Sequence, residues 1–389
     1  MTEVPGDFEH YMKVAEELFP KVKAASSQIH NDREIPPQLV QEIADKGMFR
    51  LLLPKSLGGA ELNFMGFLKI IQYIGQADSS TAWCLNQNNI LATNSVRMPE
   101  VVAKEIWKEQ RAVMTNGPPT SSSKAVQVDG GYRLSGRWNF SSGIRHATWV
   151  AAIAPVSRDS HEQDSNTSRR DSRIFLLPKE KVQVHDAWDV RGLRGTGSFS
   201  FEVDDVFVPS DHTYSSSDPS RERGPVYAIP TVLTFGAGFA TAALGNARAS
   251  LDAVIELAVT KTPAYGTTRL RDMSTMQRQL GQAEGMWRSC RAYLSEAIDA
   301  IWTSACERGT LTLDDRIDLR LAATHAIRTS CEIVNIAYNL GGSDAVFEHS
   351  PLQRQFQDAN VMSQQGQGRM MHFDVAGAHF LGLEPEGLF

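Results

Sequence analysis

The sequence predicts an α+β protein with a helical N-terminal domain, a small central β-barrel or β-sandwich domain, and a C-terminal four-helix-bundle domain. Apolar residues recur at helical spacing as far as about residue 110, for example at Val14, Leu18 and Val22. From there to about residue 209, short β-rich runs alternate with Gly and Ser turns. The helical pattern then returns. This unusual order places the domains at residues 1–111, 112–224 and 225–389.

The N-terminal helices carry recognisable stop and start signals. Gly47 and the stretch from Pro54 to Gly59 end the early helices, and residues 64–74 form another helix with its apolar residues on one face. The segment from Asp78 to Thr81 then supplies an N-cap for a helix that contains Trp83 and Leu85.

The central and C-terminal segments are equally distinct. We expect strands near residues 124–128, 132–134, 149–156, 173–177 and 198–208, with a hairpin turn at Asp129-Gly130-Gly131. The polar, mixed-charge residues 158–172 predict an exposed loop, and residues 210–224 a linker. Helices are expected at 231–260, 273–308 and 313–340, with two or more after Gly342.

Composition excludes several classes of function. The net charge is −6, and no long Lys/Arg cluster points to nucleic acid. No segment approaches the roughly 20 apolar residues of a membrane helix, and no secretory signal is visible. The four cysteines are scattered and form no C-x-x-C pair, so we expect neither disulfides nor a metal site, and a cytoplasmic location.

Several motifs occur in a fixed order along the chain. By the order and spacing of these motifs, the chain resembles the acyl-CoA dehydrogenase superfamily. Within that superfamily it is most similar to the branch of two-component (group D) flavin-dependent monooxygenases. The motifs that carry this resemblance lie at Leu53–Gly59, Ala77–Trp83, Ser135–Gly143, Arg191–Pro209, Leu340–Gly342 and Pro351–Ala359.

The residues themselves suit a flavin, whose ring needs hydrogen-bond donors where reduction places negative charge. Ser141 and Ser142 precede Gly143 at a strand end, and the resemblance places Ser141 beside N5 and O4 of the flavin. The Gly-rich turn that holds Arg194, Thr196 and Ser198 suits phosphate or ring-edge contacts. A plain strand end or β-turn remains the alternative explanation of both segments.

The resemblance adds further cofactor contacts. It places Thr115 at the flavin pyrimidine, and it brings Arg269 and the loop at Gly341 and Gly342 to the cofactor of a neighbouring subunit. A solvated arginine and a glycine helix cap are the simpler alternatives for the last three residues.

The chain also departs from the family pattern. Gly366 stands where most acyl-CoA dehydrogenases have their catalytic glutamate, so ordinary desaturation is disfavoured. The monooxygenase branch often has two histidines near the substrate; their places here are Asn88 and a position near Gln365, and an amide is not a general base. Replacement candidates are His146 and Arg145, which could hydrogen-bond the flavin–oxygen adduct, and His372; a structural role is the alternative for each histidine.

The sequence therefore predicts a flavin-dependent monooxygenase that oxidises a small aromatic or heteroatom-bearing molecule with O2. Reduced FAD or FMN would come from a separate flavin reductase, since no G-x-G-x-x-G nicotinamide fingerprint follows a strand. We expect a homo-oligomer, a tetramer by the resemblance. Two alternatives remain open: an FAD-dependent dehydrogenase or oxidative cyclase on a non-standard substrate, and a non-catalytic flavin-binding protein.

Overall fold

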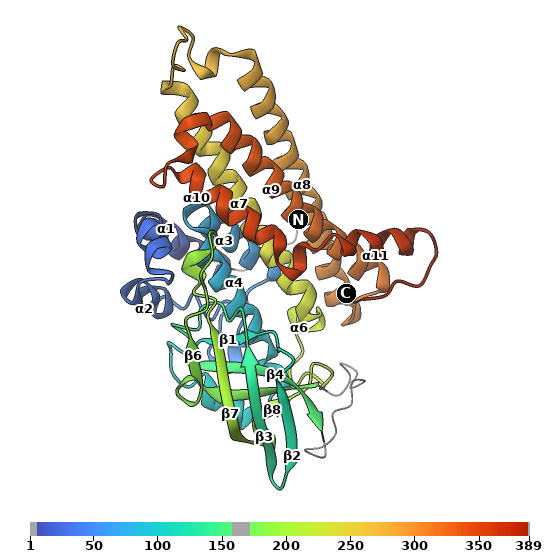
Figure 1. Ribbon diagram of the computed structural model, residues 1–389. Coiled ribbons are helices and arrows are strands. Elements are labelled where there is room, and N and C mark those ends of the chain that lie inside the picture. The colour runs from blue at the N-terminus through green and yellow to red at the C-terminus, as the bar shows by residue number, and fades with distance from the viewer. Residues whose placement is uncertain (1–5, 158–171, 388–389) are drawn as a thin grey trace.

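The computed structural model describes residues 6–157 and 172–387 and confirms the predicted succession of helices, strands and helices. The strands gather at one end of the molecule and the long helices extend from the other, with α3 and α4 between them (Figure 1). All of the predicted loop at residues 158–172 except Ser172 lies outside the described residues. Within the described part of the chain, no helix combines the length and hydrophobicity needed to cross a bilayer.

The N-terminal segment forms five α-helices in the described residues: α1 (Gly6–Asp32), α2 (Pro37–Asp45), α3 (Phe64–Ala77), α4 (Ser79–Thr93) and α5 (Glu100–Ile106). As predicted, α4 begins at a cap, because the backbone N–H of Thr81 donates to the Asp78 carboxylate at 2.7 Å. Every residue of α4 is buried, so this helix is enclosed on all sides by protein. Side chains on any face of α4 can therefore reach an internal site.

The central strands join into one mixed sheet. They are β1 (Met114–Gly117), β2 (Lys124–Val128), β3 (Gly131–Trp138), β4 (Trp149–Ser157), β5 (Ser172–Pro178), β6 (Gln183–His185), β7 (Ser200–Pro209) and β8 (Thr213–Tyr214). Their order is β6-β7-β3-β2-β4-β5-β8, with β1 paired parallel to β4. The predicted hairpin turn links the antiparallel strands β2 and β3, and Gly130 adopts the positive φ of 75° that such a turn needs.

The C-terminal helices are α6 (Pro225–Ala228), α7 (Thr231–Thr260), α8 (Ser274–Arg308), α9 (Leu313–Gly341), α10 (Pro351–Gln364) and α11 (Met371–Phe380). A capping box between Thr312 and Asp315 starts α9. The small residues of α7 allow close contact with α3: a Cβ on Gly245 would lie 2.6 Å from the Gln72 carbonyl oxygen.

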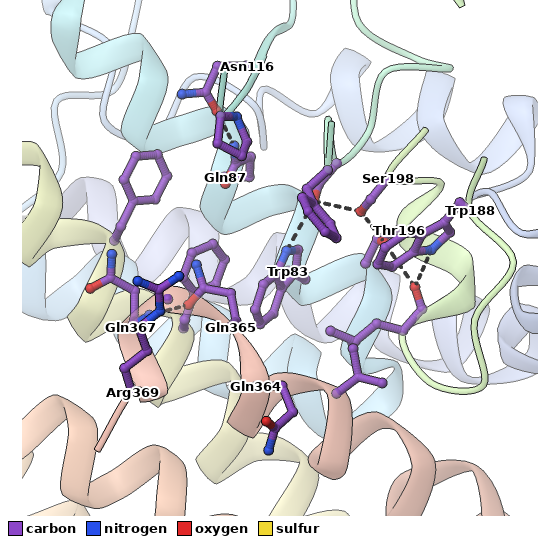
Figure 2. A pocket seen from close by; sticks show the side chains of 18 of the residues that line it. Trp83, Gln87, Asn116, Trp188, Thr196, Ser198, Gln364, Gln365, Gln367 and Arg369 are labelled. Carbon is purple, nitrogen blue, oxygen red and sulfur yellow. Dashed lines mark hydrogen bonds between the residues drawn. The ribbon is translucent and has the colours of Figure 1, made fainter. Parts of the chain in front are cut away.

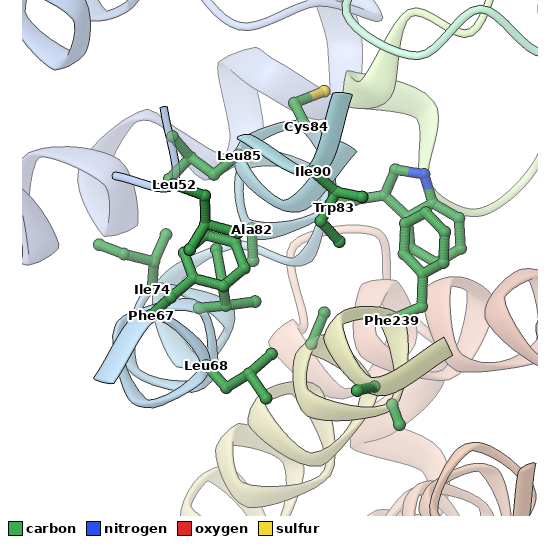
Figure 3. Packing of buried hydrophobic residues seen from close by; sticks show 14 of the residues in the cluster. Leu52, Phe67, Leu68, Ile74, Ala82, Trp83, Cys84, Leu85, Ile90 and Phe239 are labelled. Carbon is green, nitrogen blue, oxygen red and sulfur yellow. The ribbon is translucent and has the colours of Figure 1, made fainter. Parts of the chain in front are cut away.

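One apolar core joins α3, α4 and α7. Phe67 and Leu68 of α3 and Leu85 of α4 belong to this core, and Trp83 of α4 stacks on Phe239 of α7 with the ring centroids 3.9 Å apart (Figure 3). Because these side chains are buried in one apolar cluster, they fix the position of α4 against the bundle. Trp83 is thereby held at the edge of the core that faces the sheet.

Candidate active site

A cavity of about 620 Å³ opens where α4, the sheet, α7 and the end of α10 meet. This volume lies within the range of small-molecule and cofactor sites. Its two sides differ chemically: hydroxyls and Trp188 lie on one, and amides with Arg369 on the other (Figure 2). The lining residues are Trp83, Gln87, Asn116, Pro118, Phe140, Ser142, Ile153, Trp188, Leu193, Thr196, Ser198, Phe235, Phe239, Val361, Gln364, Gln365, Gly366, Gln367 and Arg369.

Three hydroxyls form a chain along one side, which we call the hydroxyl cluster: Ser142, Thr196 and Ser198. The Ser142 and Ser198 oxygens lie 2.8 Å apart, and those of Ser198 and Thr196 lie 2.6 Å apart. The Trp83 indole N–H donates to the Ser142 hydroxyl at 3.2 Å. The cluster thus brings together predicted residues from two segments that are distant in sequence.

Residues outside the cavity surface hold the Gly-rich turn in place. The Leu193 N–H donates to the Asp358 carboxylate at 2.6 Å, and burial raises the pKa of this carboxyl to about 7. A Cβ on Gly192 would lie 2.0 Å from the Gln357 carbonyl oxygen of α10. The Arg194 guanidinium donates to the carbonyls of His30 and Val190 and does not line the cavity. The structure therefore gives Arg194 a role in holding the turn.

The adjacent serines have different surroundings. Ser142 lines the cavity, and its carbonyl accepts from the Thr115 hydroxyl at 2.6 Å. Ser141 is fully buried outside the lining, and its hydroxyl has no hydrogen-bond partner among the described residues. Thr115 is also buried behind the wall, so it positions Ser142 from below the cavity surface. Of the two adjacent serines after strand β3, Ser142 is the one that faces the cavity, whereas the resemblance places Ser141 beside the flavin.

Asn88 and His146 lie together but behind the wall. The Asn88 side-chain oxygen lies 3.2 Å from His146 Nε2, while its amide donates to the Met114 carbonyl at 2.8 Å. Burial, helped by the charge of Lys179, lowers the pKa of His146 to about 3, so the ring is neutral near pH 7. Arg145 lies over the Phe199 ring at 4.6 Å and does not line the cavity.

The cavity contains a pair of amide side chains, Gln87 and Asn116, that the sequence does not predict as site residues. Gln87 donates from its side-chain nitrogen to the Asn116 side-chain oxygen at 2.5 Å. Gln87 follows Trp83 by one helical turn, which puts both on one face of α4. The helical spacing from Trp83 is therefore a sequence signal that indicates Gln87 in place of Asn88. Gln365, near the predicted substrate position, does line the cavity, and its side-chain oxygen accepts from the Gln367 N–H at 2.6 Å.

Arg269, Gly341 and Gly342 lie away from the cavity. Lys261 joins their segments, because its ammonium donates to the Gly341 carbonyl at 3.1 Å and its carbonyl accepts from the Leu270 N–H at 3.0 Å. The gold loop between α7 and α8 that carries Arg269 lies at the end of the bundle remote from the strands (Figure 1). These residues are therefore grouped with one another and apart from the hydroxyl cluster.

Family models match both helical regions. The acyl-CoA dehydrogenase N-terminal domain matches residues 11–99, and the acyl-CoA dehydrogenase C-terminal domain matches residues 237–366. The chain belongs to the acyl-CoA dehydrogenase family. The described residues of the central sheet lie between the two matched regions, as the resemblance predicted.

Curated relatives of this acyl-CoA dehydrogenase family member are oxygenases. Indole-3-acetate monooxygenase of Pseudomonas putida is 29% identical over 93% of this chain and 91% of its own length. The oxygenase component of an FADH(2)-dependent resorcinol hydroxylase from Rhizobium sp. is 25% identical over 94% and 93%.

Solved structures share the fold. 3-HSA hydroxylase from Rhodococcus sp. RHA1 has a TM-score of 0.87 at 23% identity, covering 97% of both chains. XiaF from Streptomyces sp., in complex with FADH2 and glycerol, has a TM-score of 0.87 at 22% identity and covers 97% of this chain and 98% of its own. TdsC from Paenibacillus sp. A11-2, with FMN and indole, has a TM-score of 0.79 at 19% identity over 95% and 96%.

The residues present fit a flavin ring. A ring that becomes electron-rich on reduction needs donors at its edge and flat apolar surfaces at its faces. The hydroxyl cluster supplies the donors, and Trp83 and Trp188 supply aromatic surfaces on the same part of the lining. No Asp or Glu occurs among the described lining residues, so no carboxylate opposes the negative charge of a reduced flavin.

Proposed function

We propose that this protein is the oxygenase of a two-component flavin-dependent monooxygenase and that it oxidises a small planar aromatic molecule with O2. The observation that carries the proposal is the division of one cavity into a hydroxyl side and an amide–aromatic side, in a chain similar over its length to named monooxygenases. The described lining has no carboxylate that could remove a substrate proton, which disfavours acyl-CoA desaturation.

The hydroxyl cluster would hold the flavin. Ser142 and Ser198 would donate to the ring edge, and Thr196, whose hydroxyl donates to the Leu193 carbonyl at 2.8 Å, would accept a hydrogen bond there. Thr115 and Arg194 would keep the two segments in place. A bound reduced flavin, FAD or FMN, supplies the electrons that activate O2 for insertion of one oxygen atom. Ser141, Asn88, Arg145 and His146 would act on the site from behind its surface, with His146 neutral.

The opposite side would hold the substrate. Phe235 and Phe239 offer flat apolar surfaces, and the Gln87–Asn116 pair fixes two amides whose remaining donors and acceptors can orient a ring substituent. The stacked rings of Trp83 and Phe239 make this side apolar, and an apolar surrounding would protect reactive oxygen chemistry from wasteful loss.

The same proposal covers partners and location. A flavin reductase would supply reduced flavin, as expected for a relative of proteins called oxygenase components. Arg269, Gly341 and Gly342 would contact the cofactor of a neighbouring subunit in a homotetramer, which is supported by their grouping at the remote end of the bundle. We also propose a cytoplasmic location. We propose in addition that the chain divides into three domains, at residues 1–111, 112–224 and 225–389.

The test supplies chemically reduced FAD or FMN and heavy-isotope oxygen gas together with a panel of small aromatics. The expected product carries one labelled oxygen atom. A product that has lost two hydrogens and carries no label would instead support the dehydrogenase alternative. If flavin binds but no product forms, the result would support the alternative of a non-catalytic flavin-binding protein.

A further inference from the structure

The substrate side of the cavity carries positive charge. Arg369 is the charged residue among the described lining residues, and the polar side chains near it are the neutral amides of Gln364, Gln365 and Gln367. Figure 2 shows Arg369 beside Gln367 and Gln365, on the side opposite Trp188, Thr196 and Ser198. The charge is thus placed away from the hydroxyl cluster.

A second guanidinium lies directly behind this surface. Arg320 of α9 is 2% exposed, and its Nη1 donates to the side-chain oxygen of Gln367. Burial lowers the pKa of Arg320 to about 10, so it stays protonated near pH 7. Burial, helped by Arg320, lowers the pKa of the adjacent His372 to about 4, so that ring adds no charge. We call Arg320, Gln367 and Arg369 the cationic wall.

The cationic wall is held in place by its neighbours. The Thr324 hydroxyl donates to the Gln367 carbonyl at 3.1 Å, and Arg328 donates to the Gly368 carbonyl at 2.6 Å. These bonds fix the backbone on the N-terminal side of Arg369, so the point from which its side chain extends into the cavity is defined.

We propose that the substrate is an aromatic acid, with its ring between the aromatic side chains and its carboxylate at the cationic wall. This inference rests on the proposed function and names the substrate class. A carboxylate accepts two hydrogen bonds from a planar guanidinium, which a neutral amide cannot match. Phe235 and Phe239, with ring centroids 5.7 Å apart, line the same cavity as Arg369 and offer apolar surface to the ring of such an acid.

The test is a binding titration on the full-length protein loaded with oxidised flavin. Indole-3-acetate is compared with its neutral isostere indole-3-acetamide by calorimetry. We expect the acid to bind at least about tenfold more tightly, which corresponds to about 1.4 kcal/mol. The preference should fall with added salt, because Arg369 is exposed.

Arg369→Gln should reduce the preference to within about twofold and leave the dissociation constants of the amide and the flavin unchanged. Arg133→Gln, which removes an equal charge from the β2–β3 hairpin, should keep the full preference. Equal binding of acid and amide to the parent protein would overturn the inference. So would an unchanged preference in Arg369→Gln, or a loss of flavin affinity there, which would assign Arg369 to the cofactor. Failure of both ligands to bind would instead count against the proposed aromatic monooxygenase.

Discussion

Ser142→Ala should lower the stability of the fold, whereas Ser141→Ala should not. The Ser142 hydroxyl accepts from the Trp83 indole N–H at 3.2 Å and lies 2.8 Å from the Ser198 hydroxyl. Ser142→Ala would leave the buried indole N–H without this acceptor, and an unsatisfied buried donor costs about 1–3 kcal/mol. Ser141→Ala removes a buried hydroxyl that has no partner among the described residues, so it should be neutral or slightly stabilising.

The measurement is thermal unfolding of the flavin-free parent and both variants, followed by circular dichroism. Ser142→Ala should unfold at a clearly lower temperature, whereas Ser141→Ala should not. Flavin affinity, measured by fluorescence quenching, should fall in Ser142→Ala by about 0.5–1.5 kcal/mol, the net value of one hydrogen bond, and change little in Ser141→Ala. If Ser141→Ala is as destabilising as Ser142→Ala, the hydrogen-bond assignment around the hydroxyl cluster is wrong.

Three further changes test other parts of the site. Asp358→Asn should raise the unfolding temperature more at pH 8 than at pH 5, because burial raises the pKa of this carboxyl from 3.8 to about 7 and the parent loses stability progressively as pH rises through that range; an equal gain at both pH values would contradict this. His146→Gln should make the protein less sensitive to acid, because burial lowers the ring pKa from 6.5 to about 3 and the parent loses stability as pH falls below about 6.5. Melting curves at pH 7 and pH 4.5 check this, and an unchanged acid sensitivity would count against a buried neutral ring. Gly192→Ala should cost at least about 1–3 kcal/mol, because its Cβ would lie 2.0 Å from the Gln357 carbonyl oxygen. Gly281→Ala in α8 is the control and should be neutral or stabilising, because outside the adjacent helix backbone no atom of the described residues lies within 4 Å of the new Cβ.

The sequence by itself determined the order of elements and much of their extent. Helix α7 spans Thr231–Thr260 as predicted, and α9 begins at Leu313. Periodicity, caps and turn glycines act over a few residues, so they can be recognised without knowledge of the rest of the chain. The order of the motifs likewise indicates the family, and the sequence predicts Ser142, Thr196 and Ser198 among the site residues, which the structure joins in one cluster.

Only the tertiary structure decided which side chains reach the cavity. Phe140 adopts a positive φ of 54°, and this turn puts Ser142 on the cavity surface and Ser141 behind it. On α4, Gln87 lines the cavity while its neighbour Asn88 points to the Met114 carbonyl. Adjacent residues in a helix or at a strand end point in different directions, and which direction faces a cavity depends on the elements packed around it. The cationic wall also depends on this packing, because it brings α9 against a loop that is distant in sequence.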